Sequence, residues 1–389
     1  PGPRACSSGP PASHSALPIS GTVTLDSLEG HLQITLFIEG DRLFRVDIAS
    51  SRPQLAQRLL AGRTARAAAE MVGNLYVLCG RAQRLAAETA AEAAVGEAVP
   101  AARLRRRETL ILAELAREHV WQLLSPMTEP NTTSIDPAPV RRILQAGEDA
   151  ALLADALTRV LTEHLLGEPP AIWLARDLEA IRRWCTEMTT PPALRLAQCL
   201  GDPDPAISHI PLLPTLSRWQ TDMLRELANN ALQEPGLCAR PLWRGRPAET
   251  GALARLWGEG GPVVPAWLGT MGRSSAARLL ARLAELARLP SRLLGDGPAV
   301  LRAWSLEDDL GVAGVETARG LLLHIVRLVA GRVADYRILA PTEWNFHPLG
   351  PLAASLAAMP ADAGLAQRAR RVVASLDPCV ACQVEIRRA

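Results

Sequence analysis

The hydrophobic period of the chain changes twice along its length, and this change is what most constrains the fold. Between residues 21 and 50, short strand-like runs such as HLQITLFI and RLFRVDI are separated by Glu-Gly pairs that favour turns. From about residue 53 the apolar residues recur every three or four positions, which predicts helices. The clearest helices are expected at roughly 103–124, 138–166, 173–188, 215–233 and 274–289, the last capped by a serine and stopped by Pro290. The Gly- and Pro-rich stretch 235–272 is expected to be a loop.

The period returns to a strand pattern near the C-terminus. After Gly311 the runs GLLLHIVRL and RVADYRILA are joined by VAGR, which predicts a hairpin. A last helix is expected at about 361–375. The pattern as a whole predicts a mainly α chain with small antiparallel β-sheets, an α+β fold.

The length and the ends of the chain bear on domains and location. Residues 1–18 are rich in Pro, Ser and Gly and are expected to form a flexible leader, followed by a single domain over residues 19–389. No run reaches the roughly 18 apolar residues that cross a bilayer, and the first twenty residues lack a signal pattern. We therefore expect a cytoplasmic protein without membrane contact.

Charge and cysteine content argue against two further classes of protein, those that bind nucleic acid and those built on disulfides. The 42 basic and 40 acidic residues leave a net charge of +2, so no overall field favours a nucleic acid partner. The seven cysteines are an odd number, which argues against a disulfide framework and for reduced thiols.

Two of the thiols, Cys379 and Cys382, form a C-x-x-C pair near the end of the chain. This spacing lets two thiolates converge on one metal or exchange with each other as a redox pair. A redox pair usually begins a helix, whereas this one follows a helix. A structural zinc site needs two more ligands, which Cys79, His347 or another histidine could supply. Both alternatives stay open on spacing alone.

Five segments occurring in order carry a resemblance to a known family: LEGHLQITL at 28–36, LCGRAQ at 78–83, ETARGLLLH at 316–324, PTEWNFHP at 341–348 and DPCVAC at 377–382. Together they resemble the large subunit of nickel-iron hydrogenases, over roughly residues 20–95 and 311–386. In that family two C-x-x-C pairs hold a nickel ion and an iron that carries two cyanides and one carbon monoxide. The resemblance implies a helical bundle like that of the large subunit.

The chain departs from the family pattern at positions that matter for the metals. The resemblance implies Cys79, Cys379 and Cys382 as metal ligands, but Ala82 stands where a fourth, bridging thiolate is expected. Three thiolates could still hold the iron unit, Fe(CN)2(CO), while nickel would be absent. A carboxylate that binds a magnesium-type ion in the family is Gln57 here.

Two further residues match the surroundings of the iron in that family. Arg319 matches the arginine that reaches over the cyanides, and a guanidinium can donate hydrogen bonds to such ligands. Glu29 matches the glutamate that relays protons beside the metals, and His31 is expected to orient its strand and not to bind metal.

Shortened, nickel-free relatives of the large subunit, the accessory proteins of the HupK/HoxV type, share PTEWNFHP and a terminal C-x-x-C. The resemblance to them implies a scaffold without enzyme activity, which binds the iron unit transiently and passes it to the apo large subunit. A HypC-type chaperone and a HypD-type iron-assembly protein are the implied partners. Two alternatives are a divergent hydrogen-activating enzyme and a hydrogenase-like interaction protein whose thiols bind zinc or nothing.

Overall fold

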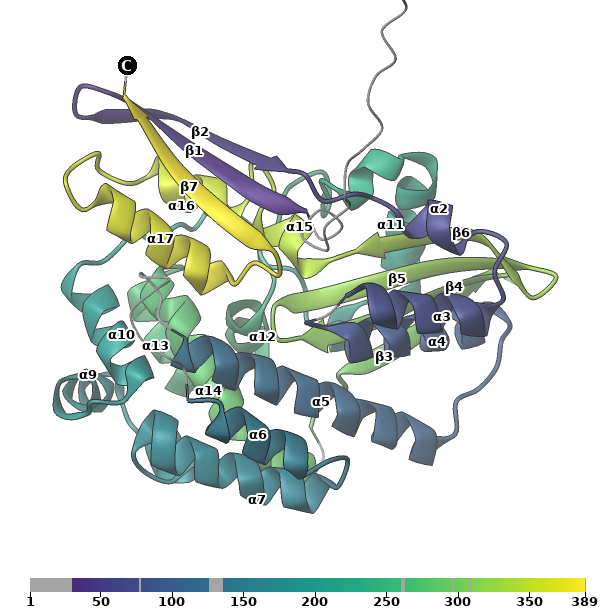
Figure 1. Cartoon of the computed structure of the whole chain (residues 1–389), viewed down its shortest axis with the longest axis horizontal. Helices are drawn as coiled ribbons and strands as arrows, with labels where there is room; N and C mark the ends of the chain where they lie inside the picture. The colour runs from purple at the N-terminus through teal and green to yellow at the C-terminus, as the bar shows by residue number, and fades with distance from the viewer. Residues whose placement is uncertain are drawn as a thin grey trace, which may run out of the picture.

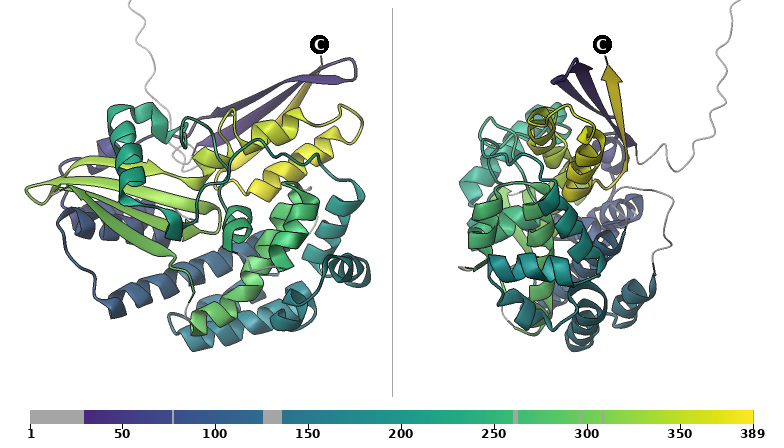
Figure 2. Two further views of the ribbon diagram at one scale, coloured as in Figure 1. Left: turned by 180° about the vertical axis from the view of Figure 1, so that it is seen from behind. Right: turned by 90° about the vertical axis from the view of Figure 1, so that its left-hand side faces the viewer.

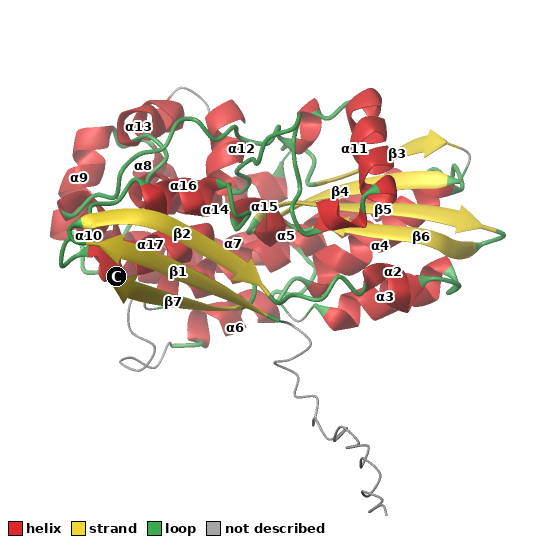
Figure 3. Cartoon of the chain, turned by 90° about the horizontal axis from the view of Figure 1, so that it is seen from above, coloured by secondary structure: helices red, strands yellow, loops and turns green. Residues whose placement is uncertain are grey.

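The computed structural model describes residues 30–76, 78–125, 136–259, 263–295, 297–307 and 309–388. The expected leader, the strand-like run before residue 29 and the candidate site residue Glu29 lie outside these ranges. Two β-sheets lie at opposite ends of an elongated molecule, and helices pack beside and beneath them (Figures 1 and 3).

A four-stranded antiparallel sheet contains the predicted hairpin. Its order is β3-β4-β5-β6, from β3 (Leu301–Glu307), β4 (Leu310–Thr317), β5 (Gly320–Val329) and β6 (Arg332–Leu339). The hairpin between β5 and β6 is confirmed, and it turns through Ala330 and Gly331, both at positive φ. Almost all of β5 is buried, because helices cover both faces of the sheet.

The helix α4 (Gly80–Ala94) packs unusually close to one face of this sheet. Its buried face is mostly alanine, and a Cβ added to Gly311 of β4 would lie 2.0 Å from the carbonyl oxygen of Ala90. Small residues on both elements allow this approach, which fixes the C-terminal end of α4 against the sheet. Helix α11 (Thr221–Gln233) covers the other face, where Leu224 and Leu227 share a buried cluster with Leu323.

The helical body is built around α14 (Ser275–Leu294), which is buried along most of its length. Its cap is Ser274, as predicted, but Pro290 lies inside the helix, so the prediction that it ends the helix was wrong. The other helices are α2 (Ala56–Leu60), α3 (Ala65–Leu75), α5 (Ala101–Leu124), α6 (Ala138–Gln145), α7 (Ala150–Val160), α8 (Pro170–Leu174), α9 (Leu178–Glu187), α10 (Pro191–Gly201), α12 (Ala252–Glu259) and α13 (Val263–Met271), with short π or 3₁₀ turns at η1 (Leu161–Leu166), η2 (Leu216–Arg218) and η3 (Pro235–Cys238). The expected loop at 235–272 thus contains two helices.

A three-stranded sheet joins the two ends of the described chain. In its order β2-β1-β7, β1 (His31–Glu39) pairs antiparallel with β2 (Arg42–Ser50) and parallel with β7 (Ala381–Arg388). The strand β7 was not predicted, and it makes this sheet mixed. The sheet packs on α16 (Pro351–Ala357) and α17 (Leu365–Leu376), seen in yellow beneath it in Figure 2. The short α15 (Pro341–Asn345) links the two sheets.

The fold class is confirmed: the chain is mainly helical with small β-sheets near both ends. Within the ranges that the structure covers, no helix is long and apolar enough to cross a membrane.

Candidate functional site

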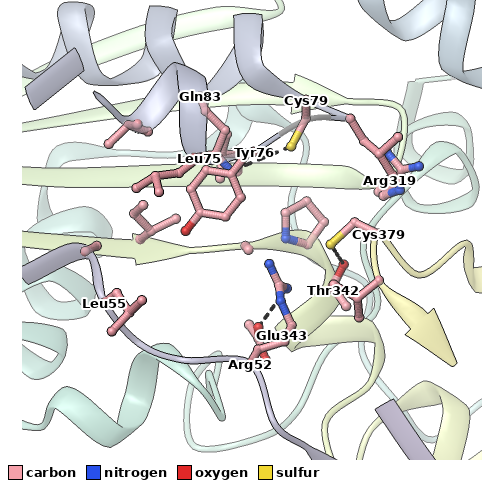
Figure 4. A pocket seen from close by; sticks show the side chains of 18 of the residues that line it. Arg52, Leu55, Leu75, Tyr76, Cys79, Gln83, Arg319, Thr342, Glu343 and Cys379 are labelled. Atoms are coloured by element: carbon pink, nitrogen blue, oxygen red, sulfur yellow. Dashed lines mark hydrogen bonds and ion pairs between the residues drawn. The ribbon is translucent and has the colours of Figure 1, made fainter. Parts of the chain in front are cut away.

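A cavity of about 450 Å³ lies where the two sheets approach each other. It collects side chains from segments far apart in the sequence: the loop after β2, the start of α4, the turn before β5, α15, and the chain before β7. Cys79, Cys379 and Arg319, three of the residues predicted for the site, all line it. The two sulfur atoms face the same space, with Arg319 beside them (Figure 4).

Cys79 is the N-cap residue of α4. The free amide groups of that helix end are bound by Glu114 of α5, whose carboxylate accepts from the backbone N–H of Arg81 at 2.9 Å and of Ala82 at 3.0 Å. Ala82 is buried in the helix core, so no side chain there reaches the cavity as a fourth ligand. Burial, with Cys379 and Glu114 nearby, raises the pKa of the Cys79 thiol to about 12.

Cys379 lies between the end of α17 and the start of β7. The helix ends at Asp377, which adopts a left-handed backbone conformation with φ 52°. The chain then turns toward α15, where the hydroxyl of Thr342 donates a hydrogen bond to Cys379 Sγ at 3.1 Å. This contact fixes the direction of the thiol toward the cavity (Figure 4).

Arg319 occupies the two-residue turn between β4 and β5, because Thr317 pairs with Gly320 across it. A side chain at Gly320 is excluded, since its φ is +133° and a Cβ would lie 2.6 Å from the hydroxyl oxygen of Thr250. The guanidinium pairs with Glu118 at 3.2 Å and with Asp377 at 3.5 Å. Burial alone would lower the pKa of Arg319, but these two carboxylates and the nearby thiols outweigh it and raise the pKa.

A second buried guanidinium, Arg52, was not predicted. It follows β2 and pairs with Glu343 of α15 at 2.9 Å, and the two side chains are only 9% and 8% exposed. Burial opposes the charge on Arg52, yet Cys379 and Glu343 raise its pKa on balance. Burial raises the pKa of Glu343 despite the attraction of Arg52. The segment PTEWNFHP contains Glu343 and could have suggested it, whereas no pattern marks Arg52.

A buried chain of polar groups leads away from Cys79. The amide of Gln83 donates toward Cys79 Sγ at 3.7 Å, and its oxygen lies 2.8 Å from Nε2 of His324. The other ring nitrogen of His324 lies 2.7 Å from the hydroxyl of Tyr336. Burial lowers the pKa of His324 to about 3, so the ring is neutral. If Nε2 carries the single ring proton, the ring donates to Gln83 and accepts from Tyr336, which aims the amide N–H at the sulfur. The spacing of four residues from Cys79 could have revealed Gln83.

Cys382 does not line the cavity. It lies in β7 opposite Leu32 of β1, and its side chain packs with Val384 and Ile386 on the apolar cluster that includes α16 and α17. Alternate residues of a strand share a face, which explains this orientation. Burial raises the pKa of Cys382 to about 12. The C-x-x-C spacing therefore does not bring both thiols together, and the role of Cys382 as a ligand stays a prediction.

Other residues named from the sequence have structural contacts of their own. Gln57 binds β6, accepting from the backbone N–H of Tyr336 at 2.5 Å and from Arg337 at 2.7 Å. His347 accepts from the backbone N–H of Leu349 at 3.0 Å and does not line the cavity. His31 bonds to Ser51 through its ring at 2.8 Å, which orients the start of β1 as expected.

No group of three His, Cys, Asp or Glu side chains suited to a metal ion is found within the described ranges. The cavity instead offers two thiols from Cys79 and Cys379, two guanidinium groups and the hydroxyl of Thr342. Soft thiolates suit iron, and the cationic donors suit anionic ligands on it.

Comparison with known proteins identifies the family. A family model described as nickel-dependent hydrogenase matches residues 296–385. The hydrogenase expression/formation protein HoxV of Cupriavidus necator is 37% identical over 370 aligned positions, covering 87% of this chain and 92% of that protein. The hydrogenase expression/formation protein HupK of Rhizobium leguminosarum bv. viciae is 30% identical, covering 88% of this chain and 93% of that protein.

The solved structures confirm the expected large-subunit fold. A reduced, active form of the nickel-iron-selenium hydrogenase from Desulfomicrobium baculatum superposes with a TM-score of 0.59 at 15% identity, covering 91% of this chain and 97% of that chain. An identity this low shows the fold alone, whereas the closer relatives cover nearly the whole chain and share its sequence. The chain therefore belongs to the family of HoxV- and HupK-type hydrogenase expression/formation proteins, which share their fold with hydrogenase large subunits.

Proposed function

We propose that this protein is an assembly scaffold in nickel-iron hydrogenase maturation, which binds the Fe(CN)2(CO) unit transiently and passes it to the apo large subunit. The kinship with expression/formation proteins supports a role in maturation. The observation that carries the finer proposal is the cavity in which Cys79 and Cys379 face each other beside Arg319 and Arg52 (Figure 4). It combines ligands for iron with donors for cyanide.

The chemistry of the cargo fits this set of groups. An iron ion that already carries three diatomic ligands has few coordination positions left, and two thiolates can occupy two of them. Cyanide bound to iron remains a hydrogen-bond acceptor, which the guanidinium groups of Arg319 and Arg52 can serve while staying charged. The volume of about 450 Å³ leaves room for the unit.

Proton competition makes the binding reversible. The thiol of Cys79 has its pKa raised to about 12 by burial, so it is protonated at neutral pH, and iron must displace that proton. Ala82 cannot contribute the additional bridging thiolate that would strengthen the hold and allow nickel to bind. A final acceptor with four thiolates therefore binds the unit more tightly, and transfer runs toward it.

We propose that Cys79 and Cys379 hold the iron at rest. Cys382 can reach the cavity only if the first residues of β7 separate from β1, because its side chain now packs on the apolar cluster. In this proposal a HypC-type chaperone and a HypD-type protein deliver the unit, and the protein itself catalyses no reaction. The two-thiol arrangement distinguishes this proposal from binding by three thiols.

The test is infrared spectroscopy with iron, nickel and zinc analysis, on protein purified without oxygen from cells that express the maturation machinery. Cyanide and carbonyl bands with iron and without nickel are expected. The bands should disappear in Cys79→Ala and Cys379→Ala, and persist in Cys382→Ala and in the control Cys185→Ala, whose thiol is buried between helices.

Each contrary result has a distinct meaning. Loss of the bands in Cys382→Ala would favour three thiol ligands. Zinc alone, or no metal and no bands, would refute the carrier role and favour an interaction protein. Full nickel occupancy with hydrogen-dependent dye reduction would indicate an enzyme.

A further inference from the structure

A second, much smaller cavity of about 20 Å³ lies beside Arg319, away from the thiols. It is enclosed by α14, the residues just before α12, and the end of α17. Its charged lining consists of one carboxylate, Glu249, and three arginines, Arg278, Arg282 and Arg319. A volume of this order holds one water molecule or one ion of similar size.

Arg282 brings a buried charge to this cavity without a carboxylate in direct contact with it. Its side chain donates from Nη2 to the carbonyl oxygen of Ser375 at 3.2 Å, and the residue is only 5% exposed. Its Nε and Nη1 have no hydrogen-bond partner in the described structure, and neither does Nη1 of Arg278. Arg278 is balanced by Glu249 at 2.8 Å, whereas no carboxylate of the described residues lies within 4.0 Å of Arg282.

The carboxylates nearest to Arg282 are already engaged. Asp377 pairs with Arg319 at 3.5 Å, and Glu285 is bound by Arg255 at 2.5 Å and lies 2.8 Å from a ring nitrogen of His119. Burial lowers the pKa of Arg282, and the positive charges of Arg319 and Arg255 act in the same direction, while the charges of Asp377 and Glu285 oppose them without outweighing burial. A buried cation with no anionic group in direct contact is costly, so a negative group is expected against its unpaired N–H groups.

We propose that this cavity binds one monatomic monovalent anion, chloride in the cell, held by the unpaired N–H groups of Arg282 and Arg278. A water molecule could accept the same hydrogen bonds, but it would leave Arg282 without a negative group in direct contact. Both arginines belong to α14, while the cavity wall includes Arg319 and Ser375. The anion therefore lies between the central helix and the turn that carries Arg319. This inference does not depend on the iron cargo.

The first test is a crystal of the full chain grown with sodium bromide in place of sodium chloride. An anomalous peak from bromide in this cavity, within hydrogen-bond distance of Arg282, is the expected result. Density for a water molecule without anomalous signal would overturn the proposal.

The second test is made in solution on the apo protein. At constant ionic strength, with gluconate as the bulky replacement anion, the midpoint of thermal unfolding should rise with chloride and then saturate. The dependence should vanish in Arg282→Met and remain in Arg107→Met, which removes a buried arginine that pairs with Glu92 at 2.5 Å far from the cavity. A wild-type midpoint that ignores chloride would refute the site, and if Arg282→Met does not fold, the wild-type response and the bromide signal decide.

Discussion

Removing Arg52 should destabilise the protein mainly through the carboxylate that it leaves behind. In Arg52→Met the apolar stem is largely kept, but Glu343, 8% exposed, loses its ion-pair partner at 2.9 Å. Breaking a buried pair by removing one partner typically costs about 3–5 kcal/mol. We expect a loss in this range in the free energy of unfolding at pH 8, where Glu343 would have to stay charged or take up a proton.

The pH dependence gives the sign of the effect. Burial already raises the pKa of Glu343 in the folded protein, and losing the attraction of Arg52 raises it further. Just above the ordinary value of 4.5 both folded proteins keep a proton that the unfolded chain has released, so their stabilities diverge only as pH rises past the raised pKa of Glu343 in folded wild type, where only the variant keeps the proton. One proton sets a limit of about 1.4 kcal/mol per pH unit. The loss in free energy of unfolding of Arg52→Met relative to wild type should therefore be small near pH 5 and large at pH 8.

The assay is guanidinium denaturation of the apo protein between pH 5 and 8, with a double-mutant cycle. Arg52→Met combined with Glu343→Gln should be more stable at pH 8 than Arg52→Met alone, because the uncompensated charge is gone. The control is Arg66→Met, which breaks a pair with Glu70 of the same length, 2.9 Å, on the surface, and should change nothing measurable. Strict additivity in the cycle, or a deficit independent of pH, would refute the reasoning.

Three further changes test the packing around the site, each by the denaturation midpoint of the apo protein. Gly311→Ala should cost about 3 kcal/mol or more, because its Cβ would meet the backbone oxygen of Ala90 at 2.0 Å, and an unchanged midpoint would show that α4 can move. His324→Phe should leave the oxygen of Gln83 without a partner, at a cost of about 1–3 kcal/mol. It should also slow alkylation of Cys79, because the hydrogen bond from Gln83 lowers the pKa of that thiol and would no longer be held in place; a normal alkylation rate would contradict this orientation. Pro290→Ala should stabilise the protein by about 1–3 kcal/mol, since proline interrupts the hydrogen bonds of α14, and a loss of stability would show that the ring is needed for packing.

Local sequence pattern predicted the elements whose signal is local. The hairpin of β5 and β6 and the capped start of α14 at Ser274 are confirmed because turn and cap residues act within a few positions. The strand β7 was missed because its partner β1 lies about 350 residues earlier, and a parallel pairing leaves no turn signal nearby. Pro290 was misread as a stop because tertiary burial around α14 outweighs the local cost of the proline.

The site was predicted unevenly for similar reasons. Cys79, Cys379 and Arg319 belong to segments that resemble the hydrogenase family, and all three line one cavity. Arg52 carries no such mark, because only the fold brings the loop after β2 to Glu343 of α15. The orientation of the Cys382 side chain could not be predicted either. The two thiols of a C-x-x-C pair can point to one site only when the second cysteine lies outside a strand, and here Cys382 is part of β7.

The lining of the thiol cavity is held by protein contacts that need no metal. The pair of Arg52 with Glu343, the pairs of Arg319 with Glu118 and Asp377, and the bond from Thr342 to Cys379 are all made within the chain. A structural metal site differs, because there the metal supplies folding free energy and its loss unfolds the domain. In the proposed scaffold the cargo can therefore leave without the fold collapsing. The raised pKa of Cys79 favours that departure, since a proton takes the place of the metal on the sulfur. A preformed cavity and a thiol that prefers its proton are together the properties expected of a carrier that must be emptied and used again.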